Sequence, residues 1–210
     1  MPGANPWNGI FTERGRVFIE VHEDIARLAA RLADLRGQRV LDLGSGTGRH
    51  LVQFARLGFS AFGLDDSPEG TRLARQWLAS EGLAADVRVG SMHDPLPYAD
   101  AFFDAVIAVQ VIHHARLSAI RRLVGEIARV LRPGGLVFVT VPALRNQASS
   151  FEEIEPGTFL PLDGPEKGLP HHYFSAEELR ELFGGFDVDD IHVDGVNHLC
   201  LSGVKRSSDR

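Results

Sequence analysis

Residues 40–49 read Val-Leu-Asp-Leu-Gly-Ser-Gly-Thr-Gly-Arg, and this stretch decides the fold. A short apolar run carries one acid, Asp42, and glycines follow at alternate positions, Gly44, Gly46 and Gly48. Glycine lets a backbone turn sharply and approach a ligand without a Cβ in the way. The pattern predicts a buried strand, a tight turn and the start of a helix, which is an arrangement that binds nucleotide-type ligands.

A second strand signal follows in residues 60–64, Ser-Ala-Phe-Gly-Leu, and it ends in Asp65 and Asp66. The carboxyl ends of neighbouring parallel strands lie at one edge of a sheet, so we expect Asp65 beside the glycine turn. A carboxylate there can accept hydrogen bonds from both hydroxyls of a ribose.

The glycine turn differs from the dinucleotide fingerprint Gly-x-Gly-x-x-Gly. Arg49 stands where that fingerprint has its last glycine, and the third glycine comes one residue early. Asp42 would repel a pyrophosphate but suits a ligand with a cationic amine. These differences disfavour a nicotinamide dinucleotide.

The segment Val40–Gly48 resembles the first motif of the class I S-adenosylmethionine-dependent methyltransferases. The resemblance covers about half of the chain, roughly residues 39–141. It implies an α/β fold with a Rossmann-like, doubly wound sheet of seven strands, mostly parallel with a C-terminal antiparallel strand. It also implies a methyltransferase of the small-molecule type that uses S-adenosylmethionine as its cosubstrate.

The resemblance also implies contacts to the cosubstrate from several strand ends. The glycine turn would hold the methionine portion, Asp65 the ribose, and the turn after residue 90 the adenine, where Ser91 replaces the aspartate that is commoner in the family. The expected cosubstrate-binding residues are Asp42, Gly44, Ser45, Gly46, Gly48, Asp65, Asp66, Ser91, Met92, His93 and Gln110.

Two pairs of histidines are candidates for catalysis. His113 and His114 follow the fourth expected strand, whose end faces the methyl group and the acceptor in the family. His171 and His172 follow later, and substrate contact is expected from one of them. A histidine suits a general base at neutral pH, so we consider His113, His114 and His172 as catalytic candidates. The alternative is that the first pair caps the next helix or fills space.

A metal site is not expected from the sequence. Adjacent histidines seldom bind one ion, no acid is fixed near them, and a single cysteine, Cys200, excludes a cysteine-based zinc site and an intrachain disulfide.

The chain is expected to form a single methyltransferase domain over residues 1–210. Helical spacing of apolar residues predicts one helix over residues 15–36, so that residues 1–36 form an N-terminal helical cover. Trp7 and Phe11 within it would present aromatic faces to a sulfonium cation or would cover the core edge. Residues 142–172 are long, rich in proline and irregular, and we expect a lid-like insertion over the acceptor site. Arg145 at its start would pair with an acceptor carboxylate or stay solvated.

Charge and hydrophobic pattern limit the kinds of partner that we expect for this protein. The formal net charge of −6 disfavours a large nucleic-acid surface, and no apolar run approaches the ~20 residues that span a bilayer. The N-terminus lacks the pattern of a signal peptide, so a cytoplasmic protein is the expectation. We therefore expect no nucleic acid and no membrane as partner, but a small-molecule acceptor, and either a monomer or a homodimer.

The acceptor and two other functions stay open at this level. Residues 110–113, Gln-Val-Ile-His, lack the motifs of nucleic-acid amino-methylating enzymes, protein arginine methyltransferases and metal-dependent catechol-type enzymes. Oxygen, nitrogen, sulfur, carbon and inorganic acceptors remain. The alternatives are a nicotinamide-dependent oxidoreductase and a non-catalytic module that binds S-adenosylmethionine.

Overall fold

The computed structural model describes residues 6–143 and 150–207. The helices are α1 (Pro6–Arg14), α2 (Ile25–Asp34), α3 (Arg49–Arg56), α4 (Pro68–Ser80), α5 (Leu117–Val130) and α6 (Ala176–Leu182). The strands are β1 (Arg39–Leu43), β2 (Ser60–Asp65), β3 (Asp86–Val89), β4 (Phe103–Val109), β5 (Leu131–Pro142), β6 (Phe151–Glu155), β7 (Thr158–Pro161), β8 (His171–His172), β9 (Phe186–Val193) and β10 (His198–Lys205).

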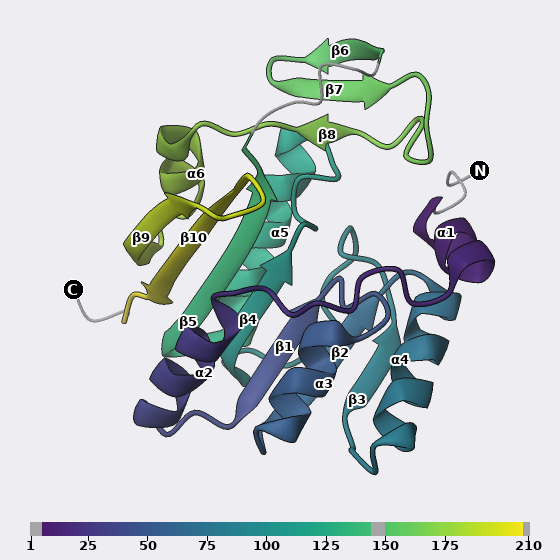
Figure 1. The fold of residues 1–210 in the computed structure, drawn as a ribbon. Coiled ribbons are helices and arrows are strands. Elements are labelled where there is room, and N and C mark those ends of the chain that lie inside the picture. The colour runs from purple at the N-terminus through teal and green to yellow at the C-terminus, as the bar shows by residue number, and fades with distance from the viewer. Residues whose placement is uncertain (1–5, 144–149, 208–210) are drawn as a thin grey trace.

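A seven-stranded sheet forms the centre of the molecule, in the order β3-β2-β1-β4-β5-β10-β9 (Figure 1). Neighbouring strands pair in parallel from β3 to β5, whereas β10 runs antiparallel to both β5 and β9. All positions of β4 are buried, as expected for a central strand that is covered on both faces. The predicted α/β fold class, with its C-terminal antiparallel strand, is confirmed.

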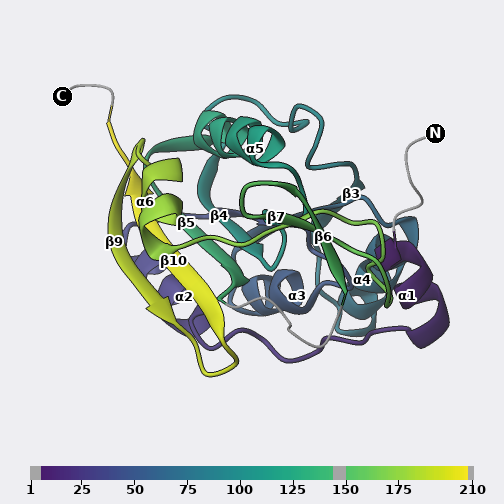
Figure 2. The same ribbon diagram turned by 90° about the horizontal axis from the view of Figure 1, so that it is seen from above.

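Helices cover both faces of the sheet, and each face has its own apolar core. The core that includes Ile25, Leu51 and Leu78 packs α2, α3 and α4 against one face. The core that includes Ile127 and Phe183 packs α5 and α6 against the other face, as the view from above shows (Figure 2). This double covering leaves the carboxyl ends of the strands as the open edge of the sheet.

The glycine turn between β1 and α3 is tied to the end of β2. The backbone N–H groups of Gly44 and Ser45 donate to the carbonyl oxygen of Leu64, at 2.7 and 3.2 Å. Gly48 precedes α3 with a φ of +92°, and a Cβ at this position would lie 2.8 Å from the Cβ of Ala74 on α4. Gly48 therefore sets how closely α3 approaches α4.

The N-terminal cover differs from the prediction of one helix over residues 15–36. Helix α1 ends before Gly15, whose φ is +67°, and α2 begins only at Ile25. The segment between them is held by tertiary contacts instead, because the N–H of His22 donates to His50 and the His22 ring contacts Asp194, at 3.2 and 3.0 Å. These contacts outweigh the helical spacing of the apolar residues.

The predicted lid, residues 142–172, is more regular than its sequence indicates. Strands β6, β7 and β8 form a small antiparallel sheet, which lies above the carboxyl ends of the main sheet (Figure 1). The prolines suggested an irregular segment, but they do not prevent these strands. Pro161 is the last residue of β7, where the missing backbone N–H costs little. Arg145 lies outside the described residues.

The C-terminal strands β9 and β10 pair antiparallel, with the turn near residues 194 and 195. Asp194 in this turn accepts hydrogen bonds from the backbone N–H groups of Val196 and His198, at 3.0 and 2.7 Å. The hairpin therefore carries its own turn chemistry and contacts His22 of the N-terminal segment.

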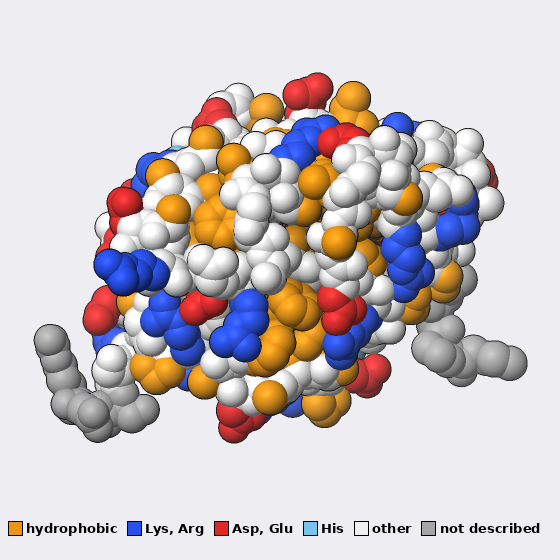
Figure 3. Space-filling model, turned by 90° about the horizontal axis from the view of Figure 1, so that it is seen from below, with side chains coloured by type: hydrophobic (Ala, Val, Ile, Leu, Met, Phe, Trp, Pro, Cys, Tyr) orange, Lys and Arg blue, Asp and Glu red, His pale blue; other side chains and the backbone are white. Residues whose placement is uncertain are grey.

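The surface opposite the lid carries basic and acidic side chains interspersed with apolar ones (Figure 3). Within the described residues, none of the helices combines the length and apolar character needed to cross a bilayer.

We predict that Gly48→Ala will destabilise the fold more than Gly58→Ala. Both glycines have positive φ, but a Cβ at Gly58 meets nothing within 4 Å. We expect a loss of about 1 kcal/mol from strain at Gly58. We expect about 2–4 kcal/mol at Gly48, where contact with Ala74 adds to the strain. Urea unfolding of the two variants measures the difference, and equal losses would show that α3 and α4 adjust without cost.

Candidate functional site

A cavity of about 1200 Å³ lies at the carboxyl ends of the main sheet, between this edge and the lid. Its walls come from the glycine turn, the ends of β2 and β4, the turn after β3, the N-terminal segment and the lid residues 163–171. The volume exceeds the ~300–1,000 Å³ typical of a site for one small molecule. The cavity therefore has room for two ligands side by side.

Asp65 at the end of β2 anchors the glycine turn. Its two carboxylate oxygens accept hydrogen bonds from the backbone N–H groups of Gly46 and Ser67, at 2.7 and 2.8 Å. Burial raises the pKa of Asp65 to about 6, although both hydrogen bonds act in the opposite direction. Each oxygen keeps a further lone pair, and Asp65 lines the cavity, so the carboxylate can also accept from a ligand.

The glycine turn divides its residues between the cavity and the core. Gly44, Ser45 and Gly46 line the cavity, and Gly44 and Gly46 have φ of +70° and +51°. The Ser45 hydroxyl is buried and has no hydrogen-bond partner among the described residues. Gly48, which was expected to bind the cosubstrate, is not among the lining residues and faces α4 instead.

Asp42 also lies away from the cavity wall, in contrast to the expected contact with the methionine portion. The residue is 2% exposed on β1, and its Oδ2 has no hydrogen-bond partner in the described part of the chain. Burial raises its pKa to about 7, while the positive charge of Arg49 acts in the opposite direction. The sequence motif gives the position of Asp42 along the chain, but it does not show whether the side chain lies beneath the turn or faces the ligand.

Four more of the residues expected to bind the cosubstrate line the cavity. They are Asp66, Ser91, Met92 and His93. The Ser91 hydroxyl accepts a hydrogen bond from the backbone N–H of His93 at 3.1 Å, which stabilises the turn after β3. The hydroxyl proton of Ser91 can still be donated to a ligand.

Gln110 lines the cavity in an unusual backbone conformation. Its φ is +60°, which is uncommon for a residue with a Cβ and is found at functional sites. The backbone N–H and the side-chain amide of Gln110 both donate to the Thr140 hydroxyl, each at 3.0 Å. Thr140 on β5 therefore holds Gln110 in place, a role that no sequence motif revealed.

Three histidines meet at the end of the cavity below the lid. His113, His114 and His171 all line the cavity, and their ring centroids lie 3.9–5.5 Å apart. Glu166 of the lid lies 3.5 Å from Nε2 of His114 and 3.2 Å from Nε2 of His171. Burial lowers the pKa of His113 and of His114, so both rings are neutral at pH 7.

His172, which was also predicted as a catalytic residue, does not belong to this group. It is absent from the cavity wall, and its Nδ1 and Nε2 lie 2.7 Å from the Thr158 hydroxyl and 3.1 Å from Glu178. Successive side chains of a strand point in opposite directions, so His171 faces the cavity and His172 faces away. The pair was noted in the sequence, but only the structure shows which member lines the site.

The N-terminal segment supplies an aromatic wall. Trp7, Phe11 and Phe18 line the cavity, with Trp7 5.9 Å from Phe11 and 6.1 Å from His114 between ring centroids. Asn8 fixes this segment, because its side-chain oxygen accepts from the Ser67 hydroxyl and from the N–H of Glu69, at 2.9 and 3.0 Å.

Glu166 is a residue of the site that the sequence did not reveal, because an acid in a long irregular segment looks the same in sequence as any acid on the surface.

We predict that His172→Ala will reduce the stability of the lid without weakening ligand binding in the cavity. The change removes the buried ring that contacts the Thr158 hydroxyl and Glu178, while Thr158 keeps its hydrogen bond to Glu155. The lost contacts should cost about 1–3 kcal/mol. Hydrogen exchange of residues 151–178 and urea unfolding measure the effect. Unchanged stability together with lost ligand binding would return His172 to the site.

The ionisation of Asp42 should make the stability depend on pH. A carboxyl whose pKa is raised in the folded state stabilises fully below its ordinary pKa of 3.8, and this contribution is lost as the pH rises through about 7. The loss is at most about 4 kcal/mol, since each pKa unit corresponds to 1.36 kcal/mol.

We predict that Asp42→Asn removes this fall in stability. Urea midpoints at pH 4 and pH 8 for the wild type and the variant measure it, with the exposed Asp163→Asn as control for the loss of a carboxylate. The same pH dependence in the wild type and in Asp42→Asn would contradict the assignment.

Comparison with known proteins identifies the family. The family model described as "Methyltransferase domain" matches residues 41–139. A ubiquinone biosynthesis O-methyltransferase of Xanthomonas campestris pv. campestris is 36% identical over 172 residues, which cover 81% of this chain and 69% of the relative. That of Methylocella silvestris is 30% identical over 172 residues, which cover 80% of this chain.

The lengths of the relatives differ from that of this chain. The matched part spans 65% of the Methylocella silvestris relative and 46% of a Xanthomonas oryzae pv. oryzae relative of the same name.

Solved structures agree on the fold. A protein from Pyrococcus horikoshii OT3 superposes with a TM-score of 0.72 at 22% identity, covering 92% of this chain and 99% of the other. A SAM-dependent methyltransferase from Methanosarcina mazei superposes with a TM-score of 0.67 at 23% identity, covering 81% and 93%. With the glycine turn, Asp65 and this cavity, the matches show that the chain belongs to the class I S-adenosylmethionine-dependent methyltransferases.

Proposed function

We propose that this protein transfers the methyl group of S-adenosylmethionine to a hydroxyl oxygen of a small-molecule acceptor. One observation carries the proposal: a single cavity is lined both by the glycine turn with Asp65 and by the histidine group beneath the lid. A bisubstrate reaction needs this arrangement, because donor and acceptor must meet in line and without water between them. The names of the O-methyltransferase relatives support oxygen as the acceptor atom.

The donor end fits S-adenosylmethionine. The methionine portion would lie along Gly44–Gly46, where positive φ angles bring the backbone close and the Ser45 hydroxyl lacks a partner among the described residues. Asp65 would accept from the ribose hydroxyls, and Met92 would pack on the adenine. Asp42 would act from beneath the turn, as a negative charge that favours the cationic amino group without touching it.

The central part of the cavity suits the sulfonium. Gln110, held by Thr140, and Trp7 line the same cavity as the glycine turn and the histidines. An aromatic face attracts a cation, and the attraction is stronger where water is excluded. Positive charge disappears during methyl transfer, so a poorly hydrated site favours the reaction.

The acceptor end offers groups that can take a proton. In the transfer, the acceptor oxygen forms a bond to the methyl carbon, the carbon–sulfur bond breaks, and its electron pair stays on sulfur. The proton of the acceptor hydroxyl must leave, and the buried neutral rings of His113 and His114 with the carboxylate of Glu166 lie where it would be released.

Membership in the family argues against a nicotinamide-dependent oxidoreductase. A module that binds S-adenosylmethionine without turnover would have the same donor end, so activity has to be measured separately from binding.

We predict that Asp65→Ala weakens binding of S-adenosylmethionine by about 1–3 kcal/mol, because two ribose hydrogen bonds are lost. Calorimetric titration of the wild type and the variant with S-adenosylmethionine and with S-adenosylhomocysteine measures this. Asp163→Ala, which removes a carboxylate from the lid side of the same cavity, is the matched control and should bind as the wild type does. Unchanged affinity of Asp65→Ala would remove Asp65 from the site.

Turnover is then tested with labelled S-adenosylmethionine against a panel of phenols, alcohols, amines and thiols. Methylation of phenols or alcohols supports the proposal. Methylation of amines or thiols alone overturns the choice of oxygen, and binding of the donor without transfer to any member of the panel supports the non-catalytic alternative.

A further inference from the structure

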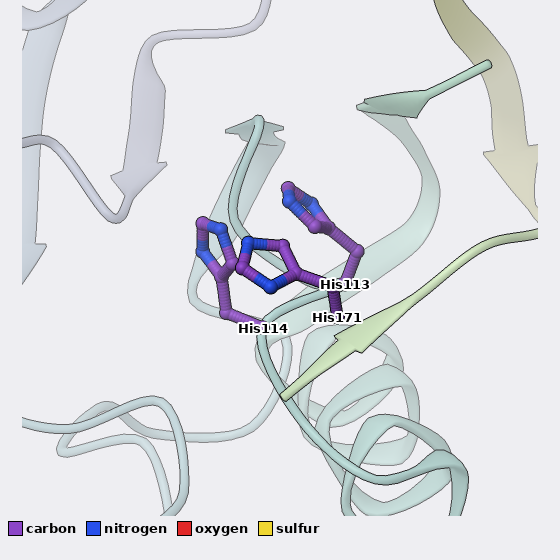
Figure 4. A group of neighbouring side chains, drawn as sticks. All are labelled: His113, His114 and His171. Carbon is purple, nitrogen blue, oxygen red and sulfur yellow. The ribbon is translucent and has the colours of Figure 1, made fainter. Parts of the chain in front are cut away.

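The group of His113, His114 and His171 has the composition of a metal site. Figure 4 shows the three rings side by side, with His113 and His114 from the loop after β4 and His171 from β8. Each ring offers one nitrogen such that all three atoms lie within 4.8 Å of one another. Three imidazoles that face one space in a cavity wall exceed what one acceptor proton requires.

Hydrogen bonding within the group leaves nitrogen atoms available. The Nδ1 atoms of His113 and His171 are buried and have no hydrogen-bond partner among the described residues. Buried polar atoms are nearly always satisfied, so two unsatisfied nitrogens in one group point to a ligand. In a cavity wall, an ion that accepts their lone pairs would satisfy both at once.

Glu166 of the lid contacts two of the three histidine rings. It contacts the Nε2 atoms of His114 and His171, at 3.5 and 3.2 Å. A carboxylate that accepts from one ring nitrogen of a histidine fixes the ring and makes the other nitrogen a better donor to a metal. For His171, the ring nitrogen opposite the one that contacts Glu166 is the unpartnered Nδ1.

We propose that His113, His114 and His171 bind one divalent transition-metal ion of the Zn²⁺ type at the acceptor end of the cavity. Neutral imidazoles select zinc and related ions rather than Mg²⁺ or Ca²⁺, which prefer oxygen ligands. Three protein ligands leave a fourth position open toward the cavity, as in catalytic zinc sites.

A bound tetrahedral ion would require the three nitrogens to approach one another. Nitrogen ligands of a tetrahedral zinc ion lie about 3.3 Å apart, since each Zn–N bond measures about 2.0–2.1 Å. The present separations are within 4.8 Å.

The structure removes both reasons for which the sequence disfavoured a metal. The third histidine comes from the other pair, so the site does not depend on adjacent residues alone. An acid is also fixed nearby, because the lid brings Glu166 to the two rings.

A role in the reaction follows, and this step rests on the proposed function. An acceptor hydroxyl at the open position of the ion would lose its proton more readily, because the ion stabilises the oxyanion. The ion would also connect the loop after β4 to the lid, since its ligands come from both.

Metal binding is tested without any activity measurement. The chain is prepared without a histidine tag, treated with EDTA, and titrated with Zn²⁺ in a calorimeter and with Co²⁺ in a spectrophotometer, where tetrahedral coordination gives intense visible absorption. We expect one ion per chain in the wild type. We expect about tenfold or greater loss of affinity in His171→Gln and His114→Gln, and a loss of about 10–100-fold in Glu166→Gln.

Two control variants locate the ion. His93→Asn changes a histidine of the same cavity outside the group, and Cys200→Ala removes the residue shared by two other groups of potential ligands, His22 with Asp194 and Asp24 with His192. Both variants should bind Zn²⁺ as the wild type does. Circular dichroism of each variant confirms that it is folded.

The proposal is overturned if the wild type does not bind Zn²⁺ or Co²⁺, if His171→Gln and His114→Gln both bind as the wild type does, or if Cys200→Ala abolishes binding. Failure of the proposed function gives a different result, namely one bound ion with no methyl transfer to the acceptor panel.

Discussion

The hydrogen bonds of the Asp65 carboxylate are the constraint on which the site depends. One oxygen holds the N–H of Gly46 and the other the N–H of Ser67, so one side chain connects the glycine turn, the end of β2 and the start of α4. Asn8 binds the same start of α4 and adds the N-terminal segment to this connection. Because one buried carboxylate organises these loops, its burial and its raised pKa are consequences of its position.

The lid and the main sheet meet at the histidine group. The N–H of His172 donates to the carbonyl oxygen of His113 at 2.9 Å, which fixes β8 to the loop after β4. This contact places His171 beside His113 and His114, while His172 points to Thr158 and Glu178 and secures the lid. The two neighbouring histidines of β8 therefore have different roles: His171 faces the cavity, and His172 holds β8 in place.

The two halves of the cavity are built from different parts of the chain. The glycine turn lies between β1 and α3, and Gly48 at its end packs closely against Ala74 of α4. The acceptor half is built from a small sheet and loops above the main sheet. Loops on a rigid scaffold are where binding specificity usually resides, so under the proposed function we expect the less regular part of the chain to select the acceptor.

The fold class and the family follow from the sequence, because both rest on local patterns: apolar strand runs, a glycine turn and an acid about twenty residues later. The residues of the donor end stay a prediction from the same patterns. The sequence did not determine that Asp42 and Gly48 face the interior, because a pattern records spacing and not the direction of a side chain. The break in the helix predicted over residues 15–36, the sheet within the lid and the meeting of His113, His114, His171 and Glu166 were decided by tertiary structure alone. Each depends on contacts between residues far apart in the chain, whose energies no local preference contains.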